Sequence, residues 1–322
     1  EFVQANVAPY GQVLRMTGGS PSNPPVYEFN KPLGMLLDTD DTPGRNNLLR
    51  IHVVDSLNNR IQRFLVKPSP VTQFPDSVFV MLTKTSGDVA DTTLDATFNK
   101  NQSMQVMLDP VYLSNTQGKA NSFMLSPFIW GGLGFAQGLL NNPSCLAKDE
   151  NSILWVTDTE NGRVQGFYVT PSNAATDATF YREFGNDINL PYGAGRLSSP
   201  TAIAYDNSGF GGFLVLDKLQ TGGYNIQKFD RDGHFIGVFA TSGDKEGQLK
   251  QPVSIAINPF DNTAFITDRA RKKVMVYNNK GEFVYEFGGD ELADPRGVTV
   301  LRNNYVYVTD AVKNMVYRYV PQ

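Results

Sequence analysis

One short pattern recurs five times along the chain, and this repetition constrains the fold more than any other feature. Each copy is an apolar strand that ends in Asp, followed by a polar turn and a second apolar strand. The aspartates are Asp55, Asp158, Asp217, Asp268 and Asp310, at intervals of 103, 59, 51 and 42 residues. Because the first interval is close to twice the others, we expect a sixth, degenerate copy between Phe64 and Pro143.

The residues around each copy supply two further strands. A strand that begins with proline precedes most copies, as at Pro200, and an outer strand that closes on glycine follows them, as from His234 to Gly243. The short apolar or alternating runs, together with 29 glycines and 19 prolines, indicate strands and turns and not helices. Four antiparallel strands in a repeat of about 45 residues are typical of a propeller blade. The sequence therefore predicts an all-β protein, a β-propeller of six four-stranded blades, one of them degenerate.

The two ends of the chain predict how the ring of blades closes. The last repeat stops at Tyr319 to Gln322 without a fourth strand, whereas Gly11 to Gly19 reads like the outer strand from Gly281 to Gly289. We expect Val13 to Thr17 to be the outer strand of the final blade, which closes the ring and covers a sheet edge that would otherwise recruit other chains.

We expect residues 1–322 to form a single propeller domain, with 1–19 as closing strand and tail. Residues 65–142 depart from the repeat, and we interpret them as a diverged blade with an insertion. They are more apolar than a surface loop needs, so the alternative is that part of them docks a partner or a second copy. The candidate docking residues there are Phe123, Phe128 and Trp130.

The repeats resemble a known family. Val156-Thr-Asp-Thr-Glu-Asn-Gly-Arg-Val-Gln165 and Val53-Val-Asp-Ser-Leu-Asn-Asn-Arg-Ile-Gln62, with proline-led strands before them, resemble the NHL repeat. The resemblance covers Pro143 to Tyr319 and Lys31 to Phe64, and the whole chain is similar to six-bladed NHL propellers. It implies a binding platform, but the family includes RNA-binding regulators, extracellular lyases, kinase sensor domains and adhesive surface proteins. A fold does not choose among these functions.

The repeated aspartates invite interpretation as a ring of ligands, but their neighbours favour a structural role. A short carboxylate at a strand end, with Asn three residues on and Arg five residues on, is suited to cap turn amides and to form an ion pair. The residues of this structural motif are Asp55, Arg60, Asp158, Arg163, Asp217, Asp268 and Asp310.

The sequence offers no catalytic residues that we can name. The amidating lyases with NHL-like propellers use a zinc ion held by three histidines, and this chain has only His52 and His234. Its one cysteine, Cys145, excludes a disulfide framework. We expect no cofactor and lean towards a protein that is not an enzyme. A lyase or hydrolase that holds a divalent metal at the central channel with carboxylates, carbonyls and water remains the alternative.

One acidic cluster offers hard oxygen ligands. Asp38, Asp40 and Asp41 precede a Pro-Gly pair in an expected loop, and such oxygens suit Ca²⁺. The segment lacks the glycine and the final glutamate of an EF-hand loop, so a solvated loop is the competing interpretation.

Charge disfavours nucleic acid as a partner. The chain has 28 basic and 32 acidic side chains, a net charge of −4. The dense basic run contains Arg269, Arg271, Lys272 and Lys273, which is a candidate binding loop. Phosphate contacts need cations spread over a whole face, so an RNA-binding propeller is kept as a further alternative beside a partner-docking patch. No apolar run approaches the length of about 20 residues that a membrane helix needs, so we expect no membrane insertion.

These observations favour a non-enzymatic binding or assembly module that associates with a protein partner or with itself, in multimers or filaments. The expected location is extracellular or at the cell surface, with the periplasm as an alternative. The motivations are the start at Glu1-Phe2, the single cysteine, few lysines and loops rich in Asn, Thr, Ser and Gly. One N-glycosylation sequon, Asn101-Gln-Ser103, would matter in that setting.

Overall fold

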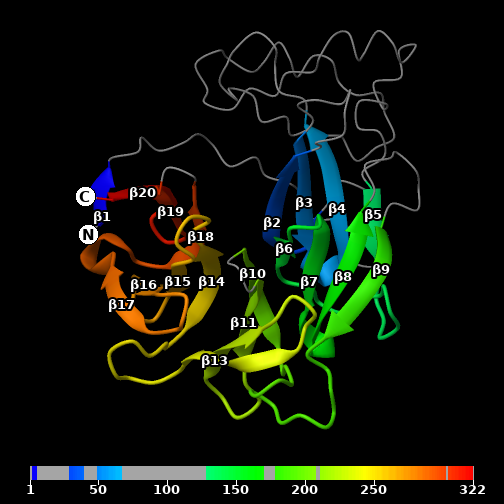
Figure 1. Cartoon of the computed structure of the whole chain (residues 1–322). Coiled ribbons are helices and arrows are strands. Elements are labelled where there is room, and N and C mark those ends of the chain that lie inside the picture. Colours follow the sequence, from blue (N-terminus) through cyan, green and yellow to red (C-terminus); the bar gives the residue numbers. More distant parts are fainter. Residues whose placement is uncertain are drawn as a thin grey trace, which may run out of the picture. The chain divides into compact units, whose positions relative to one another are not determined.

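The computed structural model describes residues 2–5, 29–39, 49–66, 128–169, 178–207, 211–301 and 304–321, and nearly all regular structure in them is β-strand (Figure 1). The strands form five sheets of four strands each, built from antiparallel pairs such as β1–β20, β10–β11, β18–β19 and β2–β3. None of the helices in these described ranges is long and apolar enough to cross a membrane.

The first sheet belongs to a compact unit made of Gly11–Leu133 and Val169–Ala178. Its strand order is β2-β3-β4-β5. The bounds are β2 (Pro32–Thr39), β3 (Leu49–Asp55), β4 (Arg60–Val66) and β5 (Phe128–Gly131), with the 3₁₀ turn η1 (Ser56–Asn58) between β3 and β4.

The other four sheets belong to a second compact unit, which contains Glu1–Tyr10, Gly134–Tyr168 and Thr179–Gln322. One sheet contains β6 (Leu146–Lys148), β7 (Ile153–Asp158), β8 (Arg163–Val169) and β9 (Ala178–Phe184), with η3 (Thr159–Asn161) after β7. The next contains β10 (Pro200–Asp206), β11 (Gly212–Lys218), β12 (Tyr224–Phe229) and β13 (Phe235–Thr241). The third contains β14 (Pro252–Ile257), β15 (Ala264–Asp268), β16 (Lys273–Tyr277) and β17 (Phe283–Phe287), followed by η4 (Gly289–Glu291). The last contains β18 (Pro295–Val300), β19 (Val306–Asp310), β20 (Met315–Pro321) and β1 (Phe2–Ala5).

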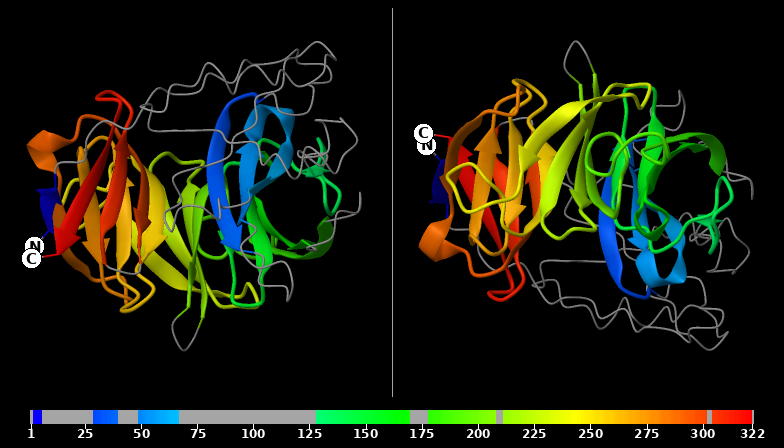
Figure 2. Two further views of the ribbon diagram at one scale, coloured as in Figure 1. Left: turned by 90° about the horizontal axis from the view of Figure 1, so that it is seen from above. Right: turned by 90° about the horizontal axis from the view of Figure 1, so that it is seen from below.

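The core of this second unit lies between successive sheets, which follow one another in both views of Figure 2. Every residue of β7 and β15 is buried. Trp155 of β7 packs against Phe213 of β11, with ring centroids 4.7 Å apart. Burial of both faces explains why these strands are continuous apolar runs and not alternating ones.

The turn between the second and third strands sets their register. In four of the five sheets the Asp pairs with the residue five positions later, as in Asp158↔Arg163 and Asp268↔Lys273. The residue before the third strand has a left-handed conformation in all four turns, with φ of 54° at Asn59 and 60° at Gly162. Glycine and asparagine tolerate this conformation best, which explains the Asn or Gly at the end of three of these turns; Lys272 ends the fourth.

The predicted count of six blades is wrong, since the described residues contain five four-stranded sheets, one for each repeated aspartate. The long first interval has another cause. Strand β5 pairs with residues 60–63 of β4, so it is the fourth strand of the first blade and not part of an additional one. The extra length is an insertion between the third and fourth strands of that blade, and residues 67–127 lie outside the described residues.

The predicted closing strand also needs correction. Val13 to Thr17 lie outside the described residues, and the outer position of the last sheet is taken by Phe2–Ala5. Strand β1 pairs with β20 from Phe2↔Pro321 to Ala5↔Arg318, and the two ends of the chain lie side by side (Figures 1 and 2). The pairing completes this sheet, and a ring closed by Val13 to Thr17 is not supported.

Candidate functional site

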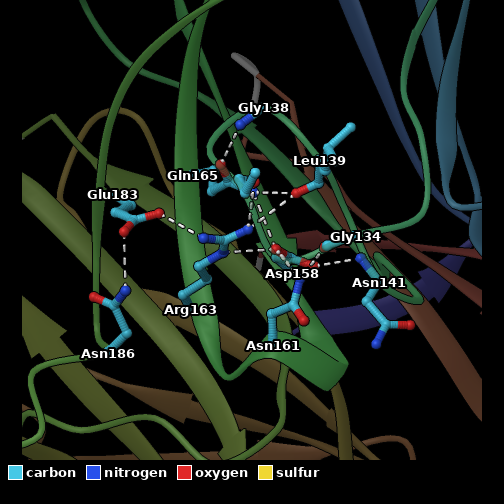
Figure 3. A network of polar contacts seen from close by, with 11 residues as sticks. Gly134, Gly138, Leu139, Asn141, Asp158, Asn161, Arg163, Gln165, Glu183 and Asn186 are labelled. Carbon is cyan, nitrogen blue, oxygen red and sulfur yellow. Dashed lines mark hydrogen bonds and ion pairs between the residues drawn. The ribbon is translucent and has the colours of Figure 1, made fainter.

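The carboxylate of Asp158, at the end of β7, is fully buried and surrounded by donors (Figure 3). Its Oδ1 accepts a hydrogen bond from the backbone N–H of Asn141 at 2.6 Å. Its Oδ2 accepts from Asn161 Nδ2 at 2.8 Å, from Arg163 Nε at 2.8 Å and from Gln165 Nε2 at 3.0 Å. These partners leave the carboxylate no exposed oxygen with which to reach a ligand.

Arg163 carries the same network into the 134–141 loop, the segment that enters this sheet before β6. Its Nη2 donates to the carbonyls of Ala136 at 3.1 Å and Leu139 at 3.0 Å, and its Nη1 donates to Glu183 at 2.8 Å. Gln165 adds a bond to the Leu139 carbonyl at 2.7 Å. The buried ion pair thus ties the turn after β7 to the loop before β6, which is a structural role.

The first sheet repeats this arrangement around Asp55. The carboxylate accepts from Asn30 N at 2.7 Å, Asn58 Nδ2 at 2.8 Å, Arg60 Nε at 2.7 Å and Gln62 Nε2 at 2.9 Å. In both sheets the Asn, Arg and Gln follow the Asp by three, five and seven residues.

Asp217 does not pair with a cation as Asp55 and Asp158 do. Its register partner on β12 is Asn225, eight residues later, where the other sheets have a spacing of five. The carboxylate accepts from Ser198 N at 2.9 Å, Ser199 N at 2.8 Å and Gln227 Nε2 at 3.1 Å. Burial raises the pKa of Asp217 to about 6, against the lowering effect of these three donors.

The last two aspartates use main-chain donors. Asp268 accepts from Lys250 N at 2.6 Å, Gln251 N at 3.1 Å and Arg271 N at 3.1 Å. Burial opposes the ionisation of Asp310, but hydrogen bonds from the protein lower its pKa below the ordinary value. The backbone donors to Asp310 are those of Ala293, Asp294, Val312 and Lys313.

The loops that these aspartates hold differ in what they expose. Residues 185–199, the 185–199 loop, connect β9 to β10 and expose Ile188 by 77%, Leu190 by 37% and Tyr192 by 42%. The guanidinium carbon of Arg196 lies 4.1 Å from the centroid of the Tyr192 ring. The preceding 134–141 loop exposes Phe135 by 77%. By contrast, the connections before β14 and β18 are rich in charged residues, among them Asp244, Lys245, Glu246, Asp290 and Glu291.

Sequence reasoning missed this apolar loop. The segment contains Ile188, Leu190 and Tyr192 at a spacing of two, but their Asn, Pro and Gly neighbours give it the composition of a turn. The available signal was three large apolar side chains within five residues of a connection that has no strand to bury them.

The basic run is largely occupied by contacts within the chain. Arg269 forms an ion pair with Asp294, and Lys273 forms one with Glu286. Arg271 donates to the carbonyl of Lys245 at 2.9 Å. Lys272 is exposed at the end of its turn. The four cations are therefore dispersed among separate contacts and do not form one cationic surface.

The remaining predicted site residues are placed as follows. Trp130 lies in β5 with 8% of its surface exposed, and Phe128 lies in the same strand. Asp38 lies in β2, opposite Arg50, and not in a loop. Phe123, Asp40, Asp41 and the Asn101 sequon lie outside the described residues. Within the described ranges, no group of three His, Cys, Asp or Glu residues is placed to hold a metal ion.

No protein-family model matches the chain. Protein brain tumor of Drosophila melanogaster is 30% identical over 117 residues, which are 36% of this chain and 11% of that protein. The chain thus spans about a tenth of that relative's length. The fold of this chain is an all-β β-propeller, and membership of the NHL family remains a prediction.

Among solved structures, Streptogramin B lyase gives a TM-score of 0.45 at 13% identity, over 88% of this chain and 77% of that one. A chain of the Nidogen/Laminin complex gives 0.43 at 19% identity, over 60% of this chain and 68% of that one. A gluconolactonase from Xanthomonas campestris gives 0.39 at 13% identity, over 57% and 64% of the two chains.

Proposed function

We propose that this chain is a protein-binding module and that the 185–199 loop is the centre of its binding surface. The observation that carries the proposal is the exposure of Ile188, Leu190 and Tyr192 on one connection. Exposed apolar side chains that occur singly need no explanation, but a group of them in one loop marks an interaction site.

The composition of the loop suits a protein partner. Tyr192 with Arg196 stacked on its ring combines two of the three residue types that are enriched at the energetic hot spots of protein interfaces. Ile188 and Leu190 supply apolar area beside them. A small polar ligand would find little here to bond, whereas an apolar protein surface would remove all three side chains from water.

The loop is also held in shape before any partner arrives. Gly193 N donates to the carbonyl of Arg196 at 2.9 Å, and Leu197 N donates to the carbonyl of Gly185 at 2.7 Å. Two residues outside the loop also bond to it: Asn225 Nδ2 donates to the carbonyl of Gly193, and Asp217 accepts from Ser198 N. A loop ordered in advance loses less conformational entropy on binding, which raises affinity.

The proposal is tested with a matched pair of variants of the full chain. The first carries Leu190→Ser and Tyr192→Ser. The control carries Phe260→Ser on the β14–β15 turn, where the side chain is 62% exposed but lies outside the loop. A partner captured from the source material is purified, and its affinity for each variant is measured by calorimetry.

We expect the double variant to lose at least tenfold in affinity and the control to lose less than twofold. If the partner is a second copy of the chain, the self-association of each variant is measured instead by sedimentation velocity over a concentration series. Equal affinity of both variants and the unmodified chain would reject the loop as the binding surface.

We further propose that the module acts outside the cell or at its surface. The single cysteine, low lysine content and polar loops support this proposal. Fractionation of source cells tests it, since a chain found only in the cytosolic fraction would contradict it.

A further inference from the structure

The turn after Asp217 differs from the equivalent turns in length. Five residues, 219–223, separate the last paired residues Lys218 and Tyr224, and Gly222 and Gly223 have φ of 86° and 81°. In the sheet of Asp158, the four-residue turn delivers Asn161 to the carboxylate and places Arg163 opposite it. The longer turn does neither, so Asp217 is buried with no cation and no donor from its own turn.

What Asp217 does contact is the 185–199 loop. Ser198 N donates to both of its oxygens, at 2.9 and 3.0 Å, and Ser199 N donates to Oδ1 at 2.8 Å. Gln227 Nε2 donates to Oδ2 at 3.1 Å, while Gln227 Oε1 accepts from Gly195 N at 2.7 Å. Asp217 and Gln227 therefore hold three separate amides of the loop that carries Tyr192.

No charged side chain on the elements packed around Asp217 is bonded to it. The loop carries Asp187 and Arg196, and Arg196 stacks on Tyr192. Lys218, the last residue of β11, is exposed, and Lys228 of β12 pairs with Asp206 of β10. Strands β13 and β14 have no charged residues. The ionisation of Asp217 is thus governed by burial and by the three donors named above.

A proton on Asp217 cannot be accommodated without a change in this network. The carboxylic acid has an O–H that needs an acceptor, but Ser198 N, Ser199 N and Gln227 Nε2 are all donors. If Gln227 reverses its amide to accept that proton, its NH₂ then faces Gly195 N, which is also a donor. Either the Ser198–Ser199 segment or Gly195 must move.

We propose that protonation of Asp217 switches the conformation of the 185–199 loop and so makes partner binding at this surface depend on pH. Loop and carboxylate form one connected network, so a change at Asp217 reaches the segment from Gly193 to Arg196 that positions Tyr192. Burial raises the pKa of Asp217 to about 6, so the switch operates in a mildly acidic range. The effect on binding rests on the proposed function, whereas the effect on the loop does not.

The test is a titration of the ¹⁵N-labelled full chain by NMR between pH 4.5 and 7.5, with no partner present. We expect the backbone amides of Gly195, Ser198 and Ser199 to shift together with a midpoint near pH 6. The amides of Ala293 and Asp294, which donate to Asp310, are the internal control and should not titrate with that midpoint, because the pKa of Asp310 is lowered.

Two variants assign the titration. Asp217→Asn should abolish the common midpoint. Gln227→Met removes one donor from the carboxylate and should move the midpoint upward; methionine is the residue at the equivalent place in the next sheet, Met275. A flat response of the three amides, or an unchanged midpoint in both variants, would overturn the switch. If the three amides titrate as expected but the variant with Leu190→Ser and Tyr192→Ser keeps its affinity for the partner, the proposed function alone is rejected.

Discussion

Asp158 and Asp217 occupy the same place in neighbouring sheets, yet their carboxylates are stabilised in different ways. Asp158 has an arginine, an asparagine and a glutamine as side-chain partners. Asp217 keeps only the glutamine, and two loop amides complete its partners. Both side chains are fully buried. The turns differ as well, and the residue opposite the carboxylate is Asn225, eight positions after Asp217, where Arg163 lies five positions after Asp158.

The comparison shows what an inserted turn changes in a repeat protein. A buried carboxylate that pairs with a buried cation is stable only while both are present. Asp217, which has three donors and no cation, is more easily protonated, because these donors do not offset the cost of burying its charge. One blade thus carries a fixed structural pair, and its neighbour carries a group that responds to pH.

The largest effect is expected from removal of the pair at Asp158. Asp158→Asn leaves the buried guanidinium of Arg163 with Glu183 as its one remaining carboxylate and should lower the free energy of unfolding by about 3 kcal/mol. Asp217→Asn strands no cation and should cost about 1 kcal/mol at pH 7. Urea unfolding of both variants measures the difference, and equal losses would show that the two sites are stabilised alike.

The second effect is the pH dependence of stability. The pKa of Asp217 in the folded chain, about 6, exceeds the ordinary value of 3.8, so the folded state binds more protons between these values. The stabilisation of the folded state by proton binding at Asp217 is therefore complete below about pH 4 and is lost as the pH rises through about 6. Its full size is about 3 kcal/mol. The difference in unfolding free energy between the unmodified chain and Asp217→Asn should change by this amount across the window. A constant difference from pH 4 to 7 would contradict it.

A third experiment restores the missing cation. Asn225→Arg places a guanidinium opposite Asp217, as Arg163 stands opposite Asp158. We expect the midpoint of the Ser198 and Ser199 amide titration to fall by about one pH unit or more, because a nearby cation favours the charged carboxylate. Asn225→Lys is the control for charge without the planar fork of arginine. An unchanged midpoint in both would mean that the missing cation does not explain the raised pKa of Asp217.

The smallest effect is expected at the surface. Lys272 ends the turn after Asp268 and is exposed, so Lys272→Asn should change the unfolding free energy by less than about 0.5 kcal/mol. Asparagine also suits the left-handed conformation there, with φ of 57°. Thermal unfolding against the unmodified chain checks this, and a large loss would indicate that the basic run has a structural role that its contacts do not show.

The sequence was a good guide to the parts of the fold that repeat. The strand-ending aspartates were recognisable because all five sheets have one at the end of their second strand, and the Asn and Arg that follow Asp55 and Asp158 were recognisable because those two turns are alike. The blade count was wrong because an insertion between β4 and β5 lengthens one interval, and spacing alone cannot distinguish an insertion from a lost repeat. Phe2–Ala5 was not recognised as a strand, since its pairing with β20 joins the two ends of the chain.

The candidate binding surface was harder to predict. Ile188, Leu190 and Tyr192 become conspicuous only when the neighbouring strands are seen to be fully packed without them. The raised pKa of Asp217 was also not apparent from the sequence, because its Asp-Lys-Leu segment looks like the other repeats until the register shows Asn225 opposite the carboxylate.

The most direct test of the binding surface is site-specific photocrosslinking in the source material. Tyr192 is replaced by p-benzoylphenylalanine in the full chain, and Phe260 is replaced in a matched chain. The proposed function predicts a discrete crosslinked protein product from position 192 and none from position 260. No product at position 192, or the same product from both positions, would contradict it.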